Sequence, residues 1–272
     1  MLKRTISGAI ITAVMLIAVI FSYVPFVFNG FMGLITAVGM YEMLKAGGVA
    51  KHKALTICSV LFAGGFVFCS AFDGFRPWLT AATILLIFAA FTYYLKNYGK
   101  ISLGDLIFAL AMTLIVAYFF STLVLVREGI QGLWHLILIF VLSWIPDTGA
   151  YLCGSAFGKH KLAPVISPKK TVEGAVGGLI ICVGLTFLYA WLVGSYAEGV
   201  SVNYWAVALY AVPGTLISIL GDLTASLVKR HYGIKDYGTL IPGHGGIMDR
   251  FDSIWFVAPF VWTVTGFVPV FF

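Results

Sequence analysis

The chain has 272 residues, of which 61% are hydrophobic and only 10% are charged. Because a soluble globular domain carries about 25% charged residues, this composition excludes an ordinary soluble fold and indicates an all-α, polytopic integral membrane protein. The net charge of +6 fits the Lys and Arg excess of cytoplasmic loops, so we expect membrane lipids as partners and no nucleic acid.

Continuous apolar runs of roughly 20 residues favour transmembrane helices over a β-barrel, whose strands would be short and alternating. The first run follows Lys3 and Arg4, as in a signal peptide, but it is long and a second run follows at once, so a retained span is expected. About nine spans are predicted, near Ile6–Ser22, Val27–Leu44, Ala54–Phe72, Trp78–Tyr94, Asp105–Val126, Leu133–Tyr151, Gly174–Val193, Trp205–Lys229 and Ser253–Phe271.

The cations predict how these spans are oriented. With a cytoplasmic N-terminus and nine alternating spans, all of the 17 Lys and Arg residues except Arg76 and Arg127 fall on the cytoplasmic side. We therefore expect a multi-pass protein of a bacterial inner membrane whose charged motifs face the cytoplasm.

The whole chain, 1–272, is expected to form a single membrane domain with two parts. Residues 1–130 are chemically quiet and would be a helical scaffold that packs around the site, cradles acyl chains or forms a homodimer contact. Glu42 should reach water at a cytoplasmic helix end, and neither it nor His135 is expected to act directly. The four cysteines are scattered through apolar runs and are interpreted as packing residues. Residues 131–272 would be the catalytic half.

The first charged block begins at the end of the sixth predicted span. Pro146 should kink that helix and free a backbone carbonyl, which would leave Asp147 at a break in a membrane helix, a common place for an ion or substrate site. The alternative is that Asp147 only caps the broken helix.

A loop follows, in which Ser167 and Pro168 precede the next predicted helix. Ser167 is a plausible N-cap, and the free N–H groups of that helix start, with Lys169 and Lys170, would bind an anion such as a triphosphate or a lipid phosphate. The alternative is a capping motif beside ordinary cytoplasmic cations.

The second charged block, residues 221–253, concentrates polar residues and glycines between two apolar runs. On a helix, Asp222, Ser226 and Lys229 share one face, and Asp249 and Asp252 lie one turn apart. Carboxylates of this kind suit Mg²⁺, alone or with a second cation. Phosphate oxygens would be met by Lys229, Arg230, Lys235 and Arg250. The alternative is an ordinary solvated loop end.

The second block resembles the signature of the phosphatidate cytidylyltransferase (CDP-diacylglycerol synthase) family. The matching run is Ser226-x-x-Lys229-Arg230-x4-Lys235-Asp236-x-Gly238-x3-Pro242-x-His244-Gly245-Gly246-x-x-Asp249-Arg250-x-Asp252. The stretches Asp147–Tyr151 and Ser167–Gly174 resemble the same family.

This resemblance implies an enzyme that transfers CMP from CTP to phosphatidic acid and releases pyrophosphate. Asp222 and Asp249 would hold Mg²⁺, with Asp252 and Asp147 in support. Lys229, Arg230 and His244 would act in catalysis, His244 by helping pyrophosphate leave or by ordering the glycine turn. The substrates would contact Asp147, Ser167, Lys169, Lys170, Lys235, Gly245, Gly246 and Arg250.

Two other functions are compatible with these residues. One is a CTP-dependent lipid-alcohol kinase, which would transfer phosphate instead of CMP. The other is an ion or substrate transporter, since transporters also use broken helices and buried carboxylates. The clustering of charged residues at one membrane face favours the enzyme.

Overall fold

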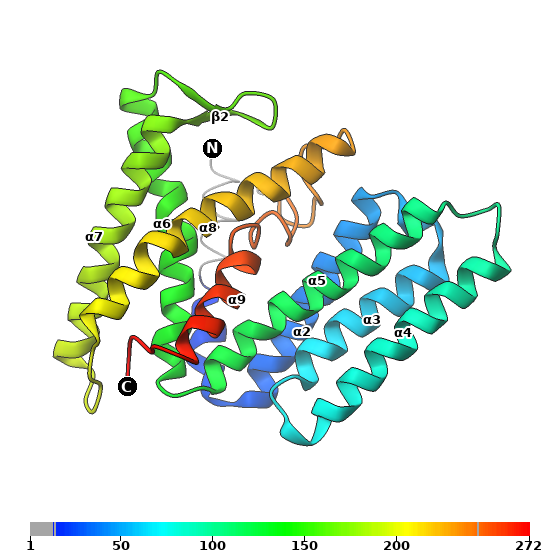
Figure 1. Cartoon of the computed structure of the whole chain (residues 1–272), viewed down its shortest axis with the longest axis horizontal. Coiled ribbons are helices and arrows are strands. Elements are labelled where there is room, and N and C mark those ends of the chain that lie inside the picture. Colours follow the sequence, from blue (N-terminus) through cyan, green and yellow to red (C-terminus); the bar gives the residue numbers. More distant parts are fainter. Residues whose placement is uncertain (1–12, 14, 244) are drawn as a thin grey trace. The chain divides into compact units, whose positions relative to one another are not determined.

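The computed structural model describes residue 13, residues 15–243 and residues 245–272. Helices dominate this part of the chain (Figure 1). They are α2 (Pro25–Ala46), α3 (Lys53–Cys69), α4 (Arg76–Lys96), α5 (Leu103–Glu128), α6 (Gly132–Phe157), α7 (Val172–Tyr196), α8 (Tyr204–His231) and α9 (Ile254–Thr265), with short 3-10 helices at Phe21–Tyr23, Val49–Lys51 and Asp73–Phe75. The fold is not purely α, because β1 (Lys161–Ala163) and β2 (Ser167–Thr171) form an antiparallel hairpin.

Six of the described helices are long and apolar enough to cross a membrane, which supports a polytopic membrane protein. With 17 and 12 residues, α3 and α9 would be about 25 and 18 Å long, less than the hydrocarbon core of about 30 Å. About half of the predicted first span, Ile6–Ser22, lies outside the described residues. The count of nine spans therefore stays a prediction. The six spans are Phe26–Ala46, Asp73–Lys96, Leu103–Glu128, Gly132–Phe157, Val172–Tyr196 and Tyr204–His231.

The predicted last span, Ser253–Phe271, is wrong as a single helix. The helix stops at Thr265, and the final residues instead pair with the segment before α8, where Ser201 N donates to Phe272 O at 2.8 Å. The buried His135 ring supports this C-terminal segment, because its Nε2 accepts from Val270 N at 3.3 Å. His135 thus has a structural role.

The described residues separate into two compact units, and the first comprises those up to residue 125 together with those between 231 and 251. It contains α2, α3, α4 and nearly all of α5. A Cβ added to Gly33 of α2 would lie 2.8 Å from the carbonyl oxygen of Gly64 in α3, so these helices approach backbone to backbone. The rings of Phe66 and Tyr118, 4.5 Å apart between centroids, pack α3 on α5.

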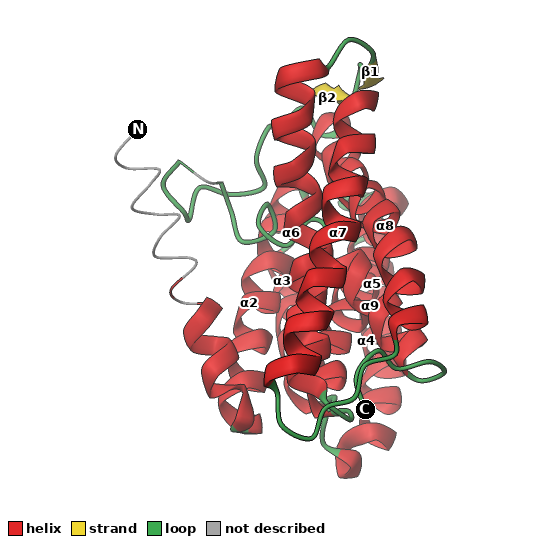
Figure 2. Ribbon diagram, turned by 90° about the vertical axis from the view of Figure 1, so that its left-hand side faces the viewer, coloured by secondary structure: helices red, strands yellow, loops and turns green. Residues whose placement is uncertain are grey.

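The second unit comprises residues 126–230 and 252–272, which include α6, α7, most of α8 and α9. The helices α6 and α7 run side by side, with the β1–β2 hairpin at one end of the pair (Figure 2). Their contact is close because Gly149 faces Gly178, whose Cα would lie 3.1 Å from a Cβ added to Gly149. Small residues thus let α6 and α7 carry the hairpin on a tightly packed base.

The predicted helix break at Pro146 is wrong, because α6 continues from Gly132 to Phe157 with the proline inside it. Proline lacks the N–H that would bond one turn back, so carbonyls near it need other donors. The carbonyl of Ser143 accepts from Ser218 Oγ of α8 at 3.1 Å. Asp147 therefore lies within a continuous helix, one turn beyond its attachment to α8.

Candidate active site

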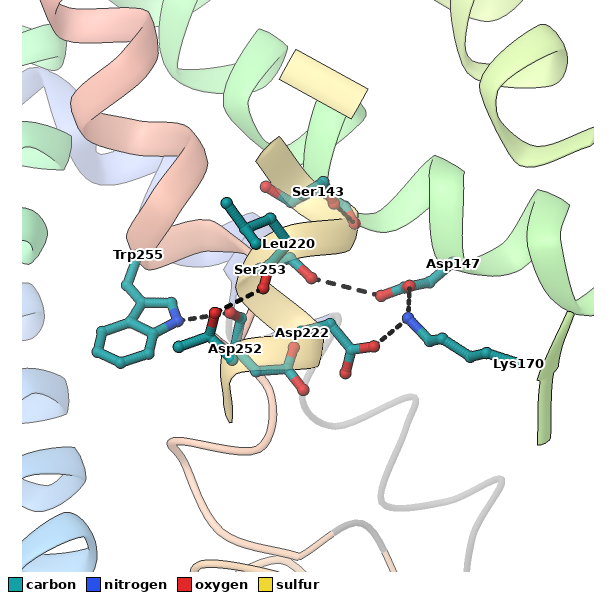
Figure 3. Close-up of polar contacts among 10 residues, drawn as sticks. Ser143, Asp147, Lys170, Leu220, Asp222, Asp252, Ser253 and Trp255 are labelled. Atoms are coloured by element: carbon teal, nitrogen blue, oxygen red, sulfur yellow. Dashed lines mark hydrogen bonds and ion pairs between the residues drawn. The ribbon is translucent and has the colours of Figure 1, made fainter. Parts of the chain in front are cut away.

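Three charged side chains of the second unit converge from different elements (Figure 3). The Nζ of Lys170 in β2 lies 3.3 Å from Oδ1 of Asp147 in α6 and forms an ion pair with Oδ2 of Asp222 in α8. The side chains are 22%, 39% and 14% exposed, respectively. We call them the Asp–Lys–Asp cluster. Two apolar helices thus direct carboxylates at one cation, which supplies the charge compensation that partly buried acids need.

Ser253, which immediately precedes α9, joins this cluster although the sequence did not single it out. Its Oγ donates to Oδ2 of Asp147 at 3.5 Å, and the residue is buried. The neighbouring residue Asp252, a predicted metal ligand, accepts at its backbone carbonyl from Trp255 Nε1 at 2.5 Å. The hydrogen bond of Ser253 to Asp147 attaches the start of α9 to the cluster (Figure 3).

A cavity of about 290 Å³ lies beside the cluster, entirely within the second unit. Its walls combine charged groups with apolar side chains, an arrangement suited to a ligand with an anionic head and an apolar part. The structure brings together here five predicted site residues: Asp147, Ser167, Lys169, Lys170 and Asp222. The other residues that line the cavity are Ala150, Tyr151, Leu162, Thr171, Ala175 and Ile219.

The hairpin that carries Lys169 and Lys170 is fixed by Glu173 in the first turn of α7. Glu173 Oε2 accepts from the backbone N–H groups of Lys159 at 3.0 Å and His160 at 3.1 Å, and Oε1 lies 2.5 Å from His160 Nδ1. This carboxylate therefore ties the start of the hairpin to the start of α7.

The prediction that Ser167 caps α7 is wrong. Ser167 begins β2, and the N-cap is Thr171, whose Oγ1 accepts from Gly174 N at 3.1 Å. The cap lies four residues later because Ser167 to Thr171 pair with β1 as an extended strand. Lys170 consequently projects from a strand and not from the loop before a helix.

The cluster has donor chemistry that fits a divalent cation. Burial lowers the pKa of Lys170, but the carboxylates of Asp147 and Asp222 outweigh this effect and raise the pKa above its ordinary value. The position between the two acids thus favours positive charge. Over the described residues of either unit, no group of three or more His, Cys, Asp or Glu side chains gathers into a complete metal site. Two carboxylates are nevertheless what Mg²⁺ commonly takes from a protein when phosphates and waters complete its shell.

Asp249, another predicted metal ligand, belongs to the first unit and organises the loop after α8. Its Oδ2 accepts from Tyr237 N at 2.8 Å and from Gly246 N at 2.9 Å, and the residue is only 5% exposed. One carboxylate oxygen thus joins two parts of the loop that are nine residues apart.

The expectation that Glu42 reaches water is wrong. It is 5% exposed, and its Oε2 accepts from the backbone N–H of Met248 at 2.9 Å. The sequence signal for such a role was a single acidic residue within an apolar run, where an acid is costly. Its partner lies 206 residues away in the chain, so no local pattern could identify the contact.

The same loop encloses a second cavity, of about 350 Å³, within the first unit. Lys235, Gly245 and Arg250, all predicted to contact substrate, lie in its wall together with Asp236 and Gly238. Two cations and a glycine-rich backbone make this cavity suitable for phosphate oxygens. Its other walls are Thr239, Ile241, Pro242 and Gly243.

The remaining predicted residues are distributed as follows. Lys229 is buried near the end of α8, whereas Arg230 is exposed and its Nε donates to Ile166 O of the hairpin turn at 3.3 Å. Gly246 is held by Asp249. His244 lies outside the described residues.

Known proteins resemble this chain over nearly all of its length. The model of the cytidylyltransferase family matches residues 2–268. A phosphatidate cytidylyltransferase of Haemophilus influenzae is 33% identical over 291 residues, with 96% of this chain and 97% of the relative covered. A phosphatidate cytidylyltransferase of Staphylococcus aureus strain COL is 34% identical over 235 residues, with coverages of 84% and 86%. The chain therefore belongs to the cytidylyltransferase family.

Proposed function

We propose that this protein transfers CMP from CTP to phosphatidic acid and produces CDP-diacylglycerol and pyrophosphate. Family membership and relatives named phosphatidate cytidylyltransferases support this reaction. The structural observation that most directly supports CMP transfer is the Asp–Lys–Asp cluster in the wall of a partly apolar cavity. Two anionic substrates, one of them a lipid, can meet only where their charge is compensated.

The reaction needs a site that positions and neutralises phosphates. A phosphate oxygen of the lipid attacks the α-phosphorus of CTP, a new P–O bond forms, and the bond to the bridging oxygen breaks as pyrophosphate leaves in line. The lipid phosphate is already ionised at neutral pH, so no general base is required. Lys169 and Lys170, in the cavity wall, would bind phosphate oxygens and hold the reacting atoms together.

Mg²⁺, alone or with a second cation, is the proposed cofactor. Asp222 and Asp147 would hold it in the second unit, and Asp249 and Asp252 are the other proposed ligands. When bound, the ion would neutralise charge on the phosphates and act as a Lewis acid.

Further phosphate contacts complete the proposal. Lys229 and Arg230 at the end of α8 are assigned to catalysis, and Lys235 and Arg250 to the phosphates of the substrates. Ser167, Gly245 and Gly246 would add hydrogen bonds. His244 is retained as the residue that assists pyrophosphate release or orders the glycine turn.

The membrane arrangement is also part of the proposal. Nine spans with a cytoplasmic N-terminus would place both charged blocks on the cytoplasmic side of a bacterial inner membrane, where CTP is present. Residues 1–130 would serve as scaffold and 131–272 as the catalytic part of one domain. A homodimer contact would lie on the scaffold.

Product analysis tests the function. Purified protein in detergent receives CTP labelled in the cytosine ring, phosphatidic acid and Mg²⁺. We expect the label in CDP-diacylglycerol and an equal amount of pyrophosphate. A parallel reaction supplies diacylglycerol in place of phosphatidic acid. Formation of phosphatidic acid and free CDP there, with no CDP-diacylglycerol in the first reaction, would instead identify a lipid-alcohol kinase. Solute flux into vesicles without nucleotide, with neither product formed, would identify a transporter.

A further inference from the structure

We propose that Glu42 of α2 is a positioning residue that holds the glycine-rich loop of residues 237–249 in the shape needed for substrate phosphates. The inference rests on the proposed function for its substrate. Glu42 itself lines neither described cavity, so it would act through the loop and not by touching a ligand.

The first support is a hydrogen bond between distant parts of the first unit. Glu42 Oε2 accepts from Met248 N at 2.9 Å, and the side chain is almost completely buried. Burying a carboxylate is costly unless it is well satisfied, so this contact must be maintained for the fold to retain an acid here.

The second support is steric. A Cβ added to Gly238 or to Gly246 would overlap the carboxylate oxygens of Glu42, although neither glycine has a left-handed φ. The backbone conformation would accept alanine at both positions, so close approach to Glu42 explains the glycines. The carboxylate therefore contacts the loop at three separate points.

The third support is the neighbouring hydrogen-bond network. Asp249 Oδ2 joins Tyr237 N to Gly246 N, next to the contact of Glu42 with Met248. Gly39, almost one turn before Glu42, also faces this loop, since an added Cβ there would be in van der Waals contact with Met248 Sδ at 3.6 Å. Two buried acids, Glu42 of α2 and Asp249 of the loop itself, thus fix the same loop.

The consequence concerns the cavity of about 350 Å³ that this loop encloses. Gly238 touches Glu42 and lines this cavity, and Lys235 and Arg250 flank the held segment. If Glu42 were lost, the loop would sample other shapes and the two cations would no longer be preorganised for an anion.

The test compares full-length wild type with Glu42→Ala and Glu42→Gln in detergent. For Glu42→Ala we expect kcat/KM for CTP to fall about tenfold to a hundredfold, mainly through KM, the factor associated with leaving one buried backbone donor unsatisfied. Hydrogen exchange in peptides covering residues 237–249 should become faster. Glu42→Gln keeps an acceptor for Met248 N, so we expect kcat/KM within about threefold of wild type.

Two further variants keep the test decisive if Glu42→Ala folds poorly. Gly246→Ala leaves Glu42 intact but should produce the same KM and exchange changes, and combining it with Glu42→Ala should add less than about threefold because both act on one contact. Thr36→Val is the matched control, since Thr36 lies buried in the same helix and donates only to Met32 O within it, at 2.7 Å.

A folded Glu42→Ala protein with wild-type KM and unchanged exchange would overturn the proposal. Equal losses in the Ala and Gln variants that only follow the amount of folded protein would also overturn it. If wild type makes no CDP-diacylglycerol, the proposed function fails, yet the exchange measurement still decides whether Glu42 holds the loop.

Discussion

Lys170 is the residue on which the electrostatics of the second unit depend. It is the cation that both Asp147 and Asp222 contact, and without it the two carboxylates would face each other across a partly buried site. Lys170→Met should therefore lower the free energy of unfolding by about 1–3 kcal/mol, less than for a fully buried pair because Asp147 remains 39% exposed.

The pH dependence of that difference follows from the raised pKa of Lys170. The stabilisation should be complete below the ordinary lysine value of about 10.4 and should disappear as the pH rises through the higher folded-state pKa. Thermal unfolding in detergent with EDTA, between pH 7 and 11, measures the difference in stability between wild type and Lys170→Met. Lys161→Met, on the adjacent strand and exposed, is the control. A wild-type advantage that declines between pH 7 and 9 would contradict this account.

At the residue scale, the sequence predicted three charged side chains that the structure brings together, but it did not predict their contacts. Asp147, Lys170 and Asp222 were named from helix faces and cation patterns, and they meet. The contact of Glu42 with Met248 was not predictable, because it depends on tertiary packing of the loop against α2 and leaves no local periodicity.

At the scale of secondary-structure elements, the β1–β2 hairpin carries Lys169 and Lys170 of the cavity wall. Glu173 fixes the start of this hairpin by accepting hydrogen bonds from its backbone. Glu173→Ala removes the acceptor for Lys159 N and His160 N, so the hairpin should open more often. We expect trypsin to cut after Lys159 and Lys161 at least about fivefold faster, because cleavage requires local opening of the hairpin.

The matched control for this cut is Glu198→Ala in the exposed connector after α7, which should leave the cleavage rate unchanged. Unchanged cleavage in Glu173→Ala would show that the hairpin is held by other contacts.

Element types were predicted more reliably than their ends or their interruptions. Long apolar runs identified most helices, because burial in lipid requires continuous backbone hydrogen bonding. The break expected at Pro146 does not occur, since α8 supplies Ser218 to a nearby carbonyl. The strand at Ser167–Thr171 was missed because its pairing partner is only three residues long and its glycine- and proline-containing surroundings indicate a loop.

At the scale of the whole molecule, the cation distribution predicts the orientation in the membrane. The ends of α4 should lie on opposite sides, with Gly74 outside and Lys100 in the cytoplasm. In a background with the four native cysteines replaced by alanine, Gly74→Cys should react with an impermeant maleimide in intact cells, and Lys100→Cys only in inverted vesicles. Space for a side chain at Gly74 is open. Labelling of both positions from one side would contradict the nine-span arrangement.

The most direct test of the central claim, that the Asp–Lys–Asp cluster is the site of CMP transfer, is the activity of Asp222→Asn. Purified wild type and variant are compared with labelled CTP, phosphatidic acid and either Mg²⁺ or EDTA, with Thr224→Val in the same helix as control, since its hydroxyl bonds only its own helix at Leu220 O. We predict Mg²⁺-dependent CDP-diacylglycerol from wild type and from Thr224→Val. Asp222→Asn should lose at least about a hundredfold in kcat while remaining folded, since Lys170 keeps Asp147 as a partner. Wild-type turnover by Asp222→Asn would place the reaction elsewhere in the molecule.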